Sequence, residues 1–298
     1  MPLSYSPLEE LDSFQSLEKI YHKGQDLSWV GKDINERNAD VYGMTQLTQE
    51  QLEAIGEIFT VILWGELAAW DTSNSLSLKI SSIGAKMAAT SQAHDEARHF
   101  FAFRDYLRKN DIAIGRPNAP TESLLNNVID TECVGKKLLG MQLMIEPVAI
   151  TIFRFVRSSN VDPILSELLK LVERDEARHI ALGVKYLPSV ISSMSFPQKV
   201  SLMLFQIKIL SLEVDGLRCL EESFNKLGID SNQVYSYAES KQIAALEELA
   251  SELGIKDKIW KPMVKAMQIQ KNLAFSKKKH EKLAYSITMI FRRILLGA

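Results

Sequence analysis

The sequence predicts an all-α fold, a bundle of long helices, and three observations lead to this prediction. From about residue 48 onward, apolar residues recur at three- and four-residue intervals, the period of an amphipathic helix. Strand-like alternation of apolar and polar residues is rare. The pentapeptide Asp-Glu-Ala-Arg-His occurs at both 95–99 and 175–179, which indicates an internal repeat of a helical unit.

The composition is that of an ordinary soluble globular protein. The chain has 298 residues, of which 46% are apolar and 24% are charged, and this balance excludes general disorder. No uninterrupted apolar run reaches the ~18 residues of a membrane helix, and the N-terminus does not resemble a secretory signal. We therefore expect a cytoplasmic protein. Cys133 and Cys219 lie in helix-like segments without metal-binding spacing, so buried free thiols are expected.

The predicted elements follow one another without a low-complexity linker, and we interpret residues 1–298 as a single domain. Residues 1–45 are irregular or briefly helical and should form a strap over the bundle. Residues 46–190 should form a four-helix bundle, with helices near 48–79, 85–110, 122–157 and 163–187. Residues 191–298 should add further helices near 197–226, 232–253 and 261–294. Breaks are expected at "SSIG" from 81, "NDIAIGRPNAPT" from 110, "SSNVDP" from 158 and "SFPQ" from 195.

The charge is distributed unevenly along the chain. Residues 256–298 contain eleven Lys or Arg against two acids, although the whole chain has a formal net charge of −2. This basic segment is either a solvated helix face or a docking surface for an acidic carrier protein, a phospholipid surface or another subunit. Nucleic acid is not expected as a partner, because interleaved aromatic residues and known binding motifs are missing from the segment.

Each copy of the pentapeptide contains Glu-x-x-His. Residues three apart share a helix face, so Glu96 points the same way as His99, and Glu176 the same way as His179. The stripe around Glu176 is otherwise apolar. Burying an unpaired charge costs several kcal/mol, and a metal cation would satisfy both groups. The alternative is a surface helix with ion pairs to basic neighbours.

Two further glutamates lie at matching positions upstream. Glu66 in "ILWGELAAW" and Glu146 in "LMIEPVAI" are each the only charge in an apolar stretch. Each precedes the Glu of the following motif by thirty residues, and the midpoint of each pair falls in a predicted break, so the repeat is a whole antiparallel helical hairpin. A metal-ligand role is predicted for both. The alternative is a structural role, in which a Trp or Arg side chain interacts with the carboxylate.

Two such hairpins joined by a long crossover resemble the ferritin-like di-iron carboxylate superfamily over residues 48–187. The resemblance implies a ferritin-like four-helix bundle with two metal ions at its centre. Hard carboxylates with one imidazole per metal suit iron or manganese better than a closed zinc site. We expect Fe/Fe, with Mn/Fe as the alternative. The residues that match the family are predicted to bind the metals and to act in catalysis. They are Glu66, Glu96, His99, Glu146, Glu176 and His179.

The resemblance also implies residues around the ligands. In this superfamily the Asp before the second motif orients the His of the first, which assigns Asp175 to His99 and Asp95 to His179. A tryptophan of the strap hydrogen-bonds to the same Asp in the family, which here corresponds to Trp29. For Asp95 the alternative is a solvated helix flank, and for Trp29 it is core packing. Pro147 lacks a backbone N–H and should kink or bulge the helix beside the site.

The strap and the additional helices make the chain resemble the ribonucleotide reductase small subunit and its ligand-binding oxidase relatives. Three family features are missing. The radical tyrosine position holds Phe103, the two positions of the oxidases' tyrosine–valine crosslink hold Met141 and Ala69, and the third histidine of aryl-amine N-oxygenases is replaced by Val172.

The resemblance therefore implies a dioxygen-activating di-iron or Mn/Fe oxidase or oxygenase that acts on a small apolar molecule, for example a fatty acyl desaturase or hydroxylase. It would need an electron donor protein and would form a homodimer. The alternatives are a non-enzymatic iron-binding or ferroxidase bundle, and a radical-generating subunit for another protein. A hydrophobic pocket beside the metals would be lined by Phe59, Ile62, Ala69, Leu139, Leu143, Ile150 and Phe153, unless these only pack the core.

Overall fold

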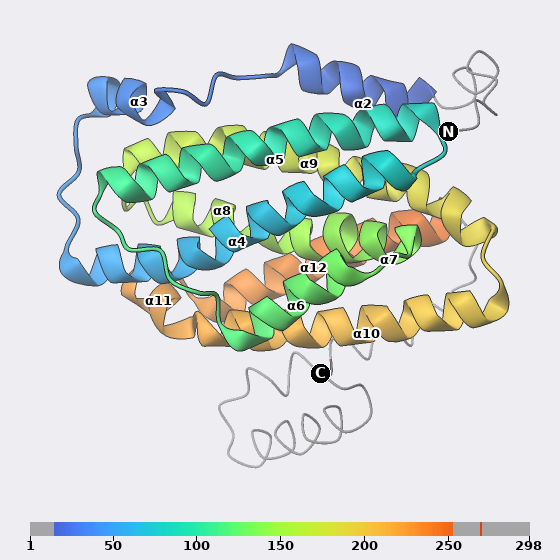
Figure 1. The fold of residues 1–298 in the computed structure, drawn as a ribbon. Helices are drawn as coiled ribbons and strands as arrows, with labels where there is room; N and C mark the ends of the chain where they lie inside the picture. The colour runs from blue at the N-terminus through green and yellow to red at the C-terminus, as the bar shows by residue number, and fades with distance from the viewer. Residues whose placement is uncertain (1–14, 253–268, 270–298) are drawn as a thin grey trace.

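The computed structural model describes residues 15–252 and residue 269, and this part of the chain is built from helices without a strand (Figure 1). The all-α prediction is thus confirmed. The predicted helix 261–294 and most of the basic segment 256–298 lie outside the described residues.

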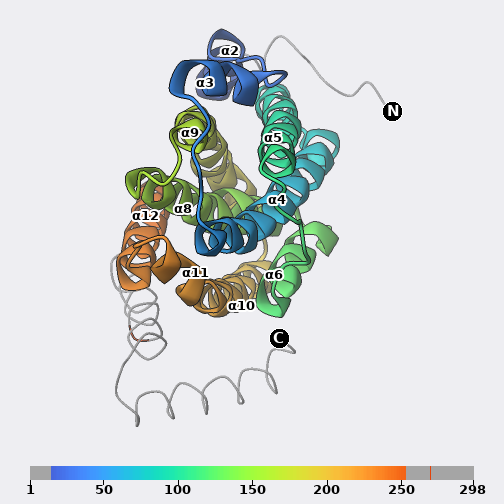
Figure 2. The ribbon, with the colours of Figure 1, turned by 90° about the vertical axis from the view of Figure 1, so that its left-hand side faces the viewer.

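Four long helical runs form two antiparallel hairpins (Figure 1), and the end-on view shows the helices lying around a common centre (Figure 2). The first hairpin consists of α4 (Gln49–Lys79) and α5 (Ile83–Lys109), which are separated by three residues at the predicted "SSIG" break. The second consists of α7 (Val134–Leu138), η1 (Leu139–Ile145) and α8 (Glu146–Ser158), followed by α9 (Pro163–Ser192). Capping explains where these helices begin, because Thr48, Ser82 and Asp162 each accept a hydrogen bond from a first-turn N–H.

The third core helix differs from its prediction. One helix was expected near 122–157, but α6 (Ala119–Asp130) is a separate element that packs against α10 and α4. The buried Lys137 explains the break, because its Nζ donates to the carbonyl oxygens of Val128 (3.3 Å) and Ile129 (2.7 Å) and so closes the end of α6. The crossover between the hairpins is therefore longer than residues 110–121 and is partly helical.

A π-helical segment, η1, lies directly before Glu146. The Glu146 N–H reaches back five residues to the carbonyl oxygen of Met141, and the next residue, Pro147, has no N–H to offer. The bulge predicted from Pro147 thus lies on the N-terminal side of Glu146. Such single π-turns are frequent at functional sites, because the extra residue rotates the side chains that follow.

The strap consists of α2 (Gln15–Asp26) and α3 (Ile34–Tyr42), which lie across α5 and α9 on one side of the bundle (Figures 1 and 2). Two glycines permit this close approach. A Cβ at Gly24 would lie 2.3 Å from the Ser91 Oγ, and a Cβ at Gly31 would lie 2.9 Å from the Arg98 Cγ. Asn35 ties the strap down by donating to the Ala102 carbonyl at 3.0 Å.

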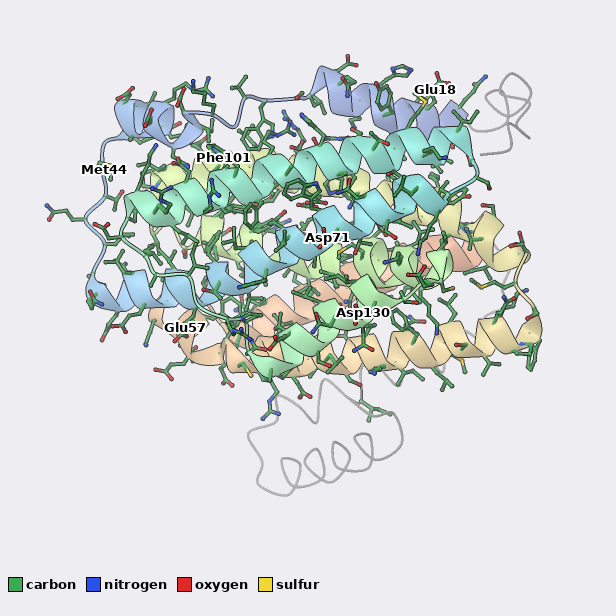
Figure 3. The ribbon with its side chains drawn as sticks, viewed as in Figure 1. Glu18, Met44, Glu57, Asp71, Phe101 and Asp130 are labelled. Atoms are coloured by element: carbon green, nitrogen blue, oxygen red, sulfur yellow. The ribbon has the colours of Figure 1, made fainter. Side chains whose placement is uncertain are left out.

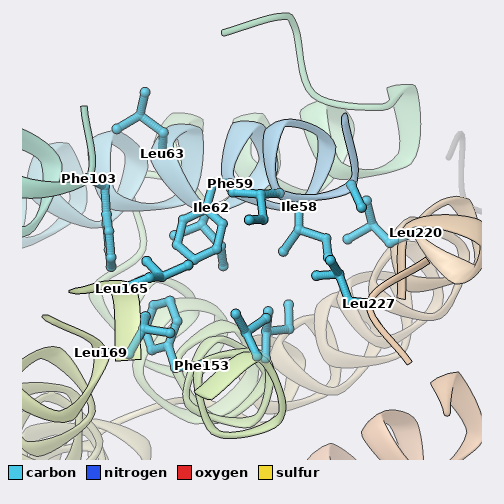
Figure 4. Close-up of a cluster of buried hydrophobic side chains, with 14 of the residues drawn as sticks. Ile58, Phe59, Ile62, Leu63, Phe103, Phe153, Leu165, Leu169, Leu220 and Leu227 are labelled. Carbon is cyan, nitrogen blue, oxygen red and sulfur yellow. The ribbon is translucent and has the colours of Figure 1, made fainter. Parts of the chain in front are cut away.

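The other side of the bundle is covered by α10 (Phe196–Cys219), α11 (Glu221–Lys226) and α12 (Ser231–Glu252), together with α6 (Figure 2). The single helix predicted near 197–226 is interrupted at Leu220. An apolar core lies toward one end of the bundle, where Ile58, Phe59 and Leu63 meet Leu165 and Leu169 from the second hairpin and Leu220 from the outer layer (Figure 4). Burial of these side chains is the main force that holds the layers together.

Charged residues such as Glu57, Asp71 and Asp130 extend outward from the helices (Figure 3). One stretch, Val134–Ser158, is long and apolar enough to cross a membrane by length and composition, but 72% of its most apolar 18-residue window is buried inside the bundle. This stretch is the first arm of the second hairpin, from α7 to α8, so its apolar composition reflects core packing. Both cysteines are free, but Cys133 is only half-buried and Cys219 is exposed, so the expected burial of these thiols was wrong.

Candidate metal centre

The structure brings the six sequence-predicted ligands together at the centre of the bundle, and all six are buried. They come from four elements: Glu66 from α4, one Glu-x-x-His pair from α5, Glu146 from the first turn of α8, and the second pair from α9. They form two groups whose ligand atoms lie within 4.8 Å of one another, namely Glu66, Glu96, His99 and Glu176, and Glu96, Glu146, Glu176 and His179.

Glu96 and Glu176 belong to both groups. Each group therefore has one imidazole, one carboxylate of its own and two shared carboxylates. Because a carboxylate has two oxygens, a shared glutamate can contact two cations at once. This donor set suits two metal ions side by side better than a closed four-coordinate zinc site.

Both histidines present Nδ1 to the cluster and Nε2 to an aspartate. His99 Nδ1 lies 3.3 Å from the nearer Glu66 oxygen, and its Nε2 lies 3.2 Å from Asp175 Oδ2. His179 Nδ1 lies 3.0 Å from Glu96 Oε1, and its Nε2 lies 3.4 Å from Asp95 Oδ2. An aspartate on the outer nitrogen leaves Nδ1 free as a donor of electrons to a cation.

The two aspartates form a closed ring with two arginines. Arg98 contacts Asp95 at 2.5 Å and Asp175 at 2.9 Å, while Arg178 contacts Asp175 at 2.8 Å and Asp95 at 2.9 Å. The ring crosses between α5 and α9, and its two negative charges are balanced by two positive ones. It therefore cannot neutralise the four glutamates of the centre.

Trp29 of the strap contacts this ring of charged side chains. Trp29 Nε1 donates to Asp175 Oδ2 at 2.7 Å, and the indole lies 4.6 Å from the Arg98 guanidinium. Asp175 therefore contacts His99, Trp29 and both arginines. The contact that the family resemblance implied for Trp29 is present in this structure.

Burial and neighbouring charges shift the pKa values of the centre in both directions, with those of Glu96 and Glu176 lowered by the nearby histidines. Burial raises the pKa of Glu66 well above its usual value, and the nearby His99 offsets only part of the effect. Burial likewise raises the pKa of Glu146 well above its usual value, with the charge of Glu176 adding to it. Burial alone would lower the pKa of His99, but neighbouring carboxylates, Asp175 first, raise it well above its usual value. The raised pKa values mean that Glu66, Glu146 and His99 retain protons, and these protons offset buried negative charge that bound cations could offset instead.

Three buried atoms at the centre make no hydrogen bond of ordinary geometry among the described residues, namely Glu66 Oε2, Glu96 Oε2 and His99 Nδ1. The imidazole atom lies 3.3 Å from the Glu66 oxygen and 3.5 Å from the Glu96 oxygen. Unsatisfied buried polar groups are rare, and all three atoms belong to predicted metal ligands. When all four carboxylates are ionised, they carry four negative charges, which two divalent cations would neutralise. The residues present thus fit a di-metal group in donor type, charge and unfilled bonding capacity.

Two glutamines beside the centre were missed by the sequence analysis. Gln92 Nε2 donates to Glu96 Oε1 at 3.0 Å and to Glu146 Oε1 at 3.1 Å, and Gln142 Nε2 donates to Gln92 Oε1 at 3.1 Å. A signal was present in the sequence, because each glutamine lies four residues before a predicted ligand and so shares its helix face. Gly183 leaves room for Gln142, since a Cβ there would lie 2.7 Å from the Gln142 Cβ.

A cavity of about 70 Å³ lies beside the centre, between α4, α6, α8 and α10. Glu66 and Glu146 form part of its wall, and most of the remaining lining is apolar. Of the seven residues predicted to line a pocket, two do so, namely Ile62 and Ala69. The other five do not belong to this wall, and four of them are buried core residues, namely Phe59, Leu139, Leu143 and Phe153.

The core also accommodates the residues that stand at the family's radical and third-histidine positions. Phe103 packs between Phe59 and Phe153, with ring centroids 5.4 and 5.7 Å away. Val172 is buried in the same core cluster. Both positions are thus occupied by apolar side chains that pack in the core.

No protein-family model matches the chain, and no curated protein matches it. Several solved structures match the chain. A protein with aldehyde deformylating oxidase activity from Synechococcus is 17% identical, with a TM-score of 0.60, over 73% of this chain and 96% of that one. An R2-like ligand-binding oxidase with a Mn/Fe cofactor is 15% identical, with a TM-score of 0.64, over 80% and 94%. The R2-like ligand-binding oxidase from Sulfolobus acidocaldarius is 19% identical, with a TM-score of 0.56, over 82% and 93%. At such low identity the likeness establishes the fold, and the chain has the ferritin-like bundle of these proteins.

Proposed function

We propose that this protein is a dioxygen-activating di-metal oxidase that acts on an apolar small molecule. The observation that carries the proposal is the pair of buried ligand groups that share Glu96 and Glu176 and retain unpartnered donor atoms. The Fe/Fe and Mn/Fe cofactors named for structural neighbours support the same donor chemistry here. Fe/Fe is our first choice, and Mn/Fe is the alternative.

When bound, the two metal ions would supply the electrons that reduce dioxygen. The chain's own residues hold and orient this centre. Glu96 and Glu176 would help to hold both metals, whereas Glu66 and Glu146 would each help to hold one and also form part of the cavity wall. Gln92 holds one oxygen of Glu96 and one of Glu146, which limits how far these two carboxylates can turn. The Asp–Arg ring orients both imidazoles.

The cavity supports an apolar substrate whose reacting carbon lies beside Glu66 and Glu146. Its volume of about 70 Å³ is roughly half that of the ~150 Å³ cavity known to hold benzene. A whole acyl chain would therefore require α6 or α10 to move outward, whereas a short apolar group fits without such motion. Desaturation or hydroxylation of an acyl group is the finer form of the proposal.

We further propose an electron donor protein, a homodimer and a cytoplasmic location. An acidic carrier protein as partner rests on the basic charge of 256–298 in the sequence. A radical-generating role is disfavoured by Phe103, which offers no phenol at the family's radical position. An iron-handling ferroxidase is the remaining alternative, and the mostly apolar cavity wall beside the centre argues against it.

The test begins with metal content and anomalous diffraction on both sides of the iron and manganese absorption edges. Wild-type protein should hold two metals about 3.5 to 4 Å apart, and Glu66→Gln should lose one of them. Asp71→Asn is the matched control, because Asp71 is an exposed acid on the same helix. The iron-loaded protein should then consume dioxygen faster in the presence of an apolar substrate. Absence of metal after anaerobic addition of iron(II) would refute the proposal, and equal dioxygen consumption with and without organic molecules would favour the ferroxidase.

A further inference from the structure

A second buried carboxyl group, Glu213 of α10, lies outside the metal centre. Only 5% of the residue is exposed, and it forms part of the wall of the same cavity as Glu66 and Glu146. It was not among the predicted site residues, although "ILSLEV" at 209–214 places this acid in a mainly apolar stretch, as the stretches around those two glutamates do.

One oxygen of this carboxyl is occupied and the other is not. Gln242 Nε2 donates to Glu213 Oε2 at 2.8 Å and to the Met144 carbonyl oxygen at 3.0 Å, so the orientation of its amide is set by two acceptors. Glu213 Oε1 is buried without a hydrogen-bond partner in the described part of the chain. Burial raises the pKa of Glu213 to about 8, and the Gln242 hydrogen bond offsets only part of this, so the group is mainly a neutral acid at pH 7.

The position of the proton follows from these contacts. Because Oε2 accepts from Gln242, the carboxyl proton resides on Oε1, which makes Oε1 a donor without an acceptor. The cavity wall offers few other polar groups besides the two glutamates of the metal centre. Thr121 is one of them, and it lies against Gly216, where a Cβ would be 2.7 Å from its Oγ1. A buried donor without an acceptor is costly, and a ligand can supply the acceptor.

We propose that Glu213 donates a hydrogen bond to the substrate, and that the substrate is an apolar molecule carrying one uncharged acceptor, a carbonyl or hydroxyl oxygen. This inference rests on the proposed function, because it assigns the substrate class of the same cavity. The Glu213 oxygen holds the acceptor, and an apolar carbon of the substrate faces Glu66 and Glu146. A carboxylate is not the acceptor, since a second buried anion beside these glutamates would be strongly disfavoured. A site built around a hydrogen bond also rejects analogues that lack the acceptor.

The test compares two probes of the same shape, propanone and 2-methylpropene, which differ in a C=O against a C=CH₂ group. Their dissociation constants are measured by ligand-observed NMR on the full-length, metal-loaded protein. Glu213→Leu should lower the preference for propanone about tenfold, the size of one buried hydrogen bond. Glu213→Gln should keep the preference, because Gln242 holds the amide oxygen and the new NH₂ then takes the place of Oε1. Glu221→Leu, the same exchange at an exposed glutamate, is the control and should change nothing.

Two outcomes overturn the inference. The first is a preference for propanone that survives Glu213→Leu, and the second is an equal loss in Glu213→Gln and Glu213→Leu. If the preference instead disappears when the metals are removed by a chelator and is unaffected by Glu213→Leu, the carbonyl binds at the metals. That result overturns the role of Glu213 and leaves the proposed function standing. Conversely, a protein that binds no metal but shows the Glu213-dependent preference would refute only the proposed function.

Discussion

Replacement of Glu213 by glutamine should stabilise the protein, and the gain should grow with pH. The carboxyl is buried without a positive partner on its free oxygen, so burial holds its pKa near 8, against 4.5 for an ordinary glutamate. Between these two values the unfolded chain releases the proton while the folded chain keeps it. The contribution of Glu213 to stability is therefore most favourable below pH 4.5 and becomes less favourable as the pH rises toward 8.

The size of the effect follows from the same two values. Each pH unit between them costs about 1.4 kcal/mol, so the whole penalty reaches roughly 5 kcal/mol near pH 8. A glutamine side chain at this position does not titrate and has nearly the same shape, with an amide oxygen that can still accept from Gln242. The free energy of unfolding of Glu213→Gln should thus exceed that of wild type by nearly nothing at pH 4.5 and by up to about 5 kcal/mol at pH 8.

Urea-induced unfolding followed by circular dichroism, at pH steps from about 5 to 8.5, measures this difference directly. Both proteins should carry the same metal content, so that titration of the centre cancels in the comparison. Glu50→Gln, at an exposed site, checks that the exchange itself does not alter stability. A difference that stays constant across the range, or a wild type more stable than Glu213→Gln at pH 8, would refute the description of Glu213 as a buried neutral acid.

Three further predictions concern the centre and its packing. Asp175→Asn should weaken metal affinity about 10- to 100-fold in chelator competition, because Asp175 orients His99, and unchanged affinity would contradict that role. Gly183→Ala should destabilise the protein by about 1–3 kcal/mol in urea, since the new Cβ would lie 2.7 Å from the Gln142 Cβ; an unchanged midpoint would show that α9 and η1 can separate at little cost. Removal of the metals should lower the melting temperature, because the bound ions stabilise only the folded state, and restoring iron(II) should reverse the loss.

Much of the arrangement could be predicted because it follows from local periodicity. The two hairpins follow from repeated segments with turns at their midpoints, and the structure places those turns at 80–82 and 159–162. Glu-x-x-His on a helix constrains two side chains to one face whatever surrounds them. The four helices and the proximity of the six predicted ligands were accessible in this way.

The sequence-based predictions failed where contacts between residues far apart in the sequence determine the local structure. The break between α6 and α7 depends on Lys137 folding back onto carbonyl oxygens of the preceding helix, which no helix propensity reveals. Gln92 was overlooked because its importance depends on reaching Glu146, fifty-four residues away on another element. The pocket residues were misassigned because Phe59 and Phe153 have the same apolar pattern whether they line a cavity or pack in the core.

The sequence by itself determined the helical class, the doubled hairpin and the six side chains that share the inner faces, because each depends on spacing along one helix. Only the tertiary structure decided that Glu96 and Glu176 belong to both ligand groups, that the Asp–Arg ring is neutral, and that Glu213 from α10 lines the cavity beside Glu66. These features depend on how four or more helices meet. Sequence spacing defines a face within one helix, whereas distance and charge balance between faces are set by packing.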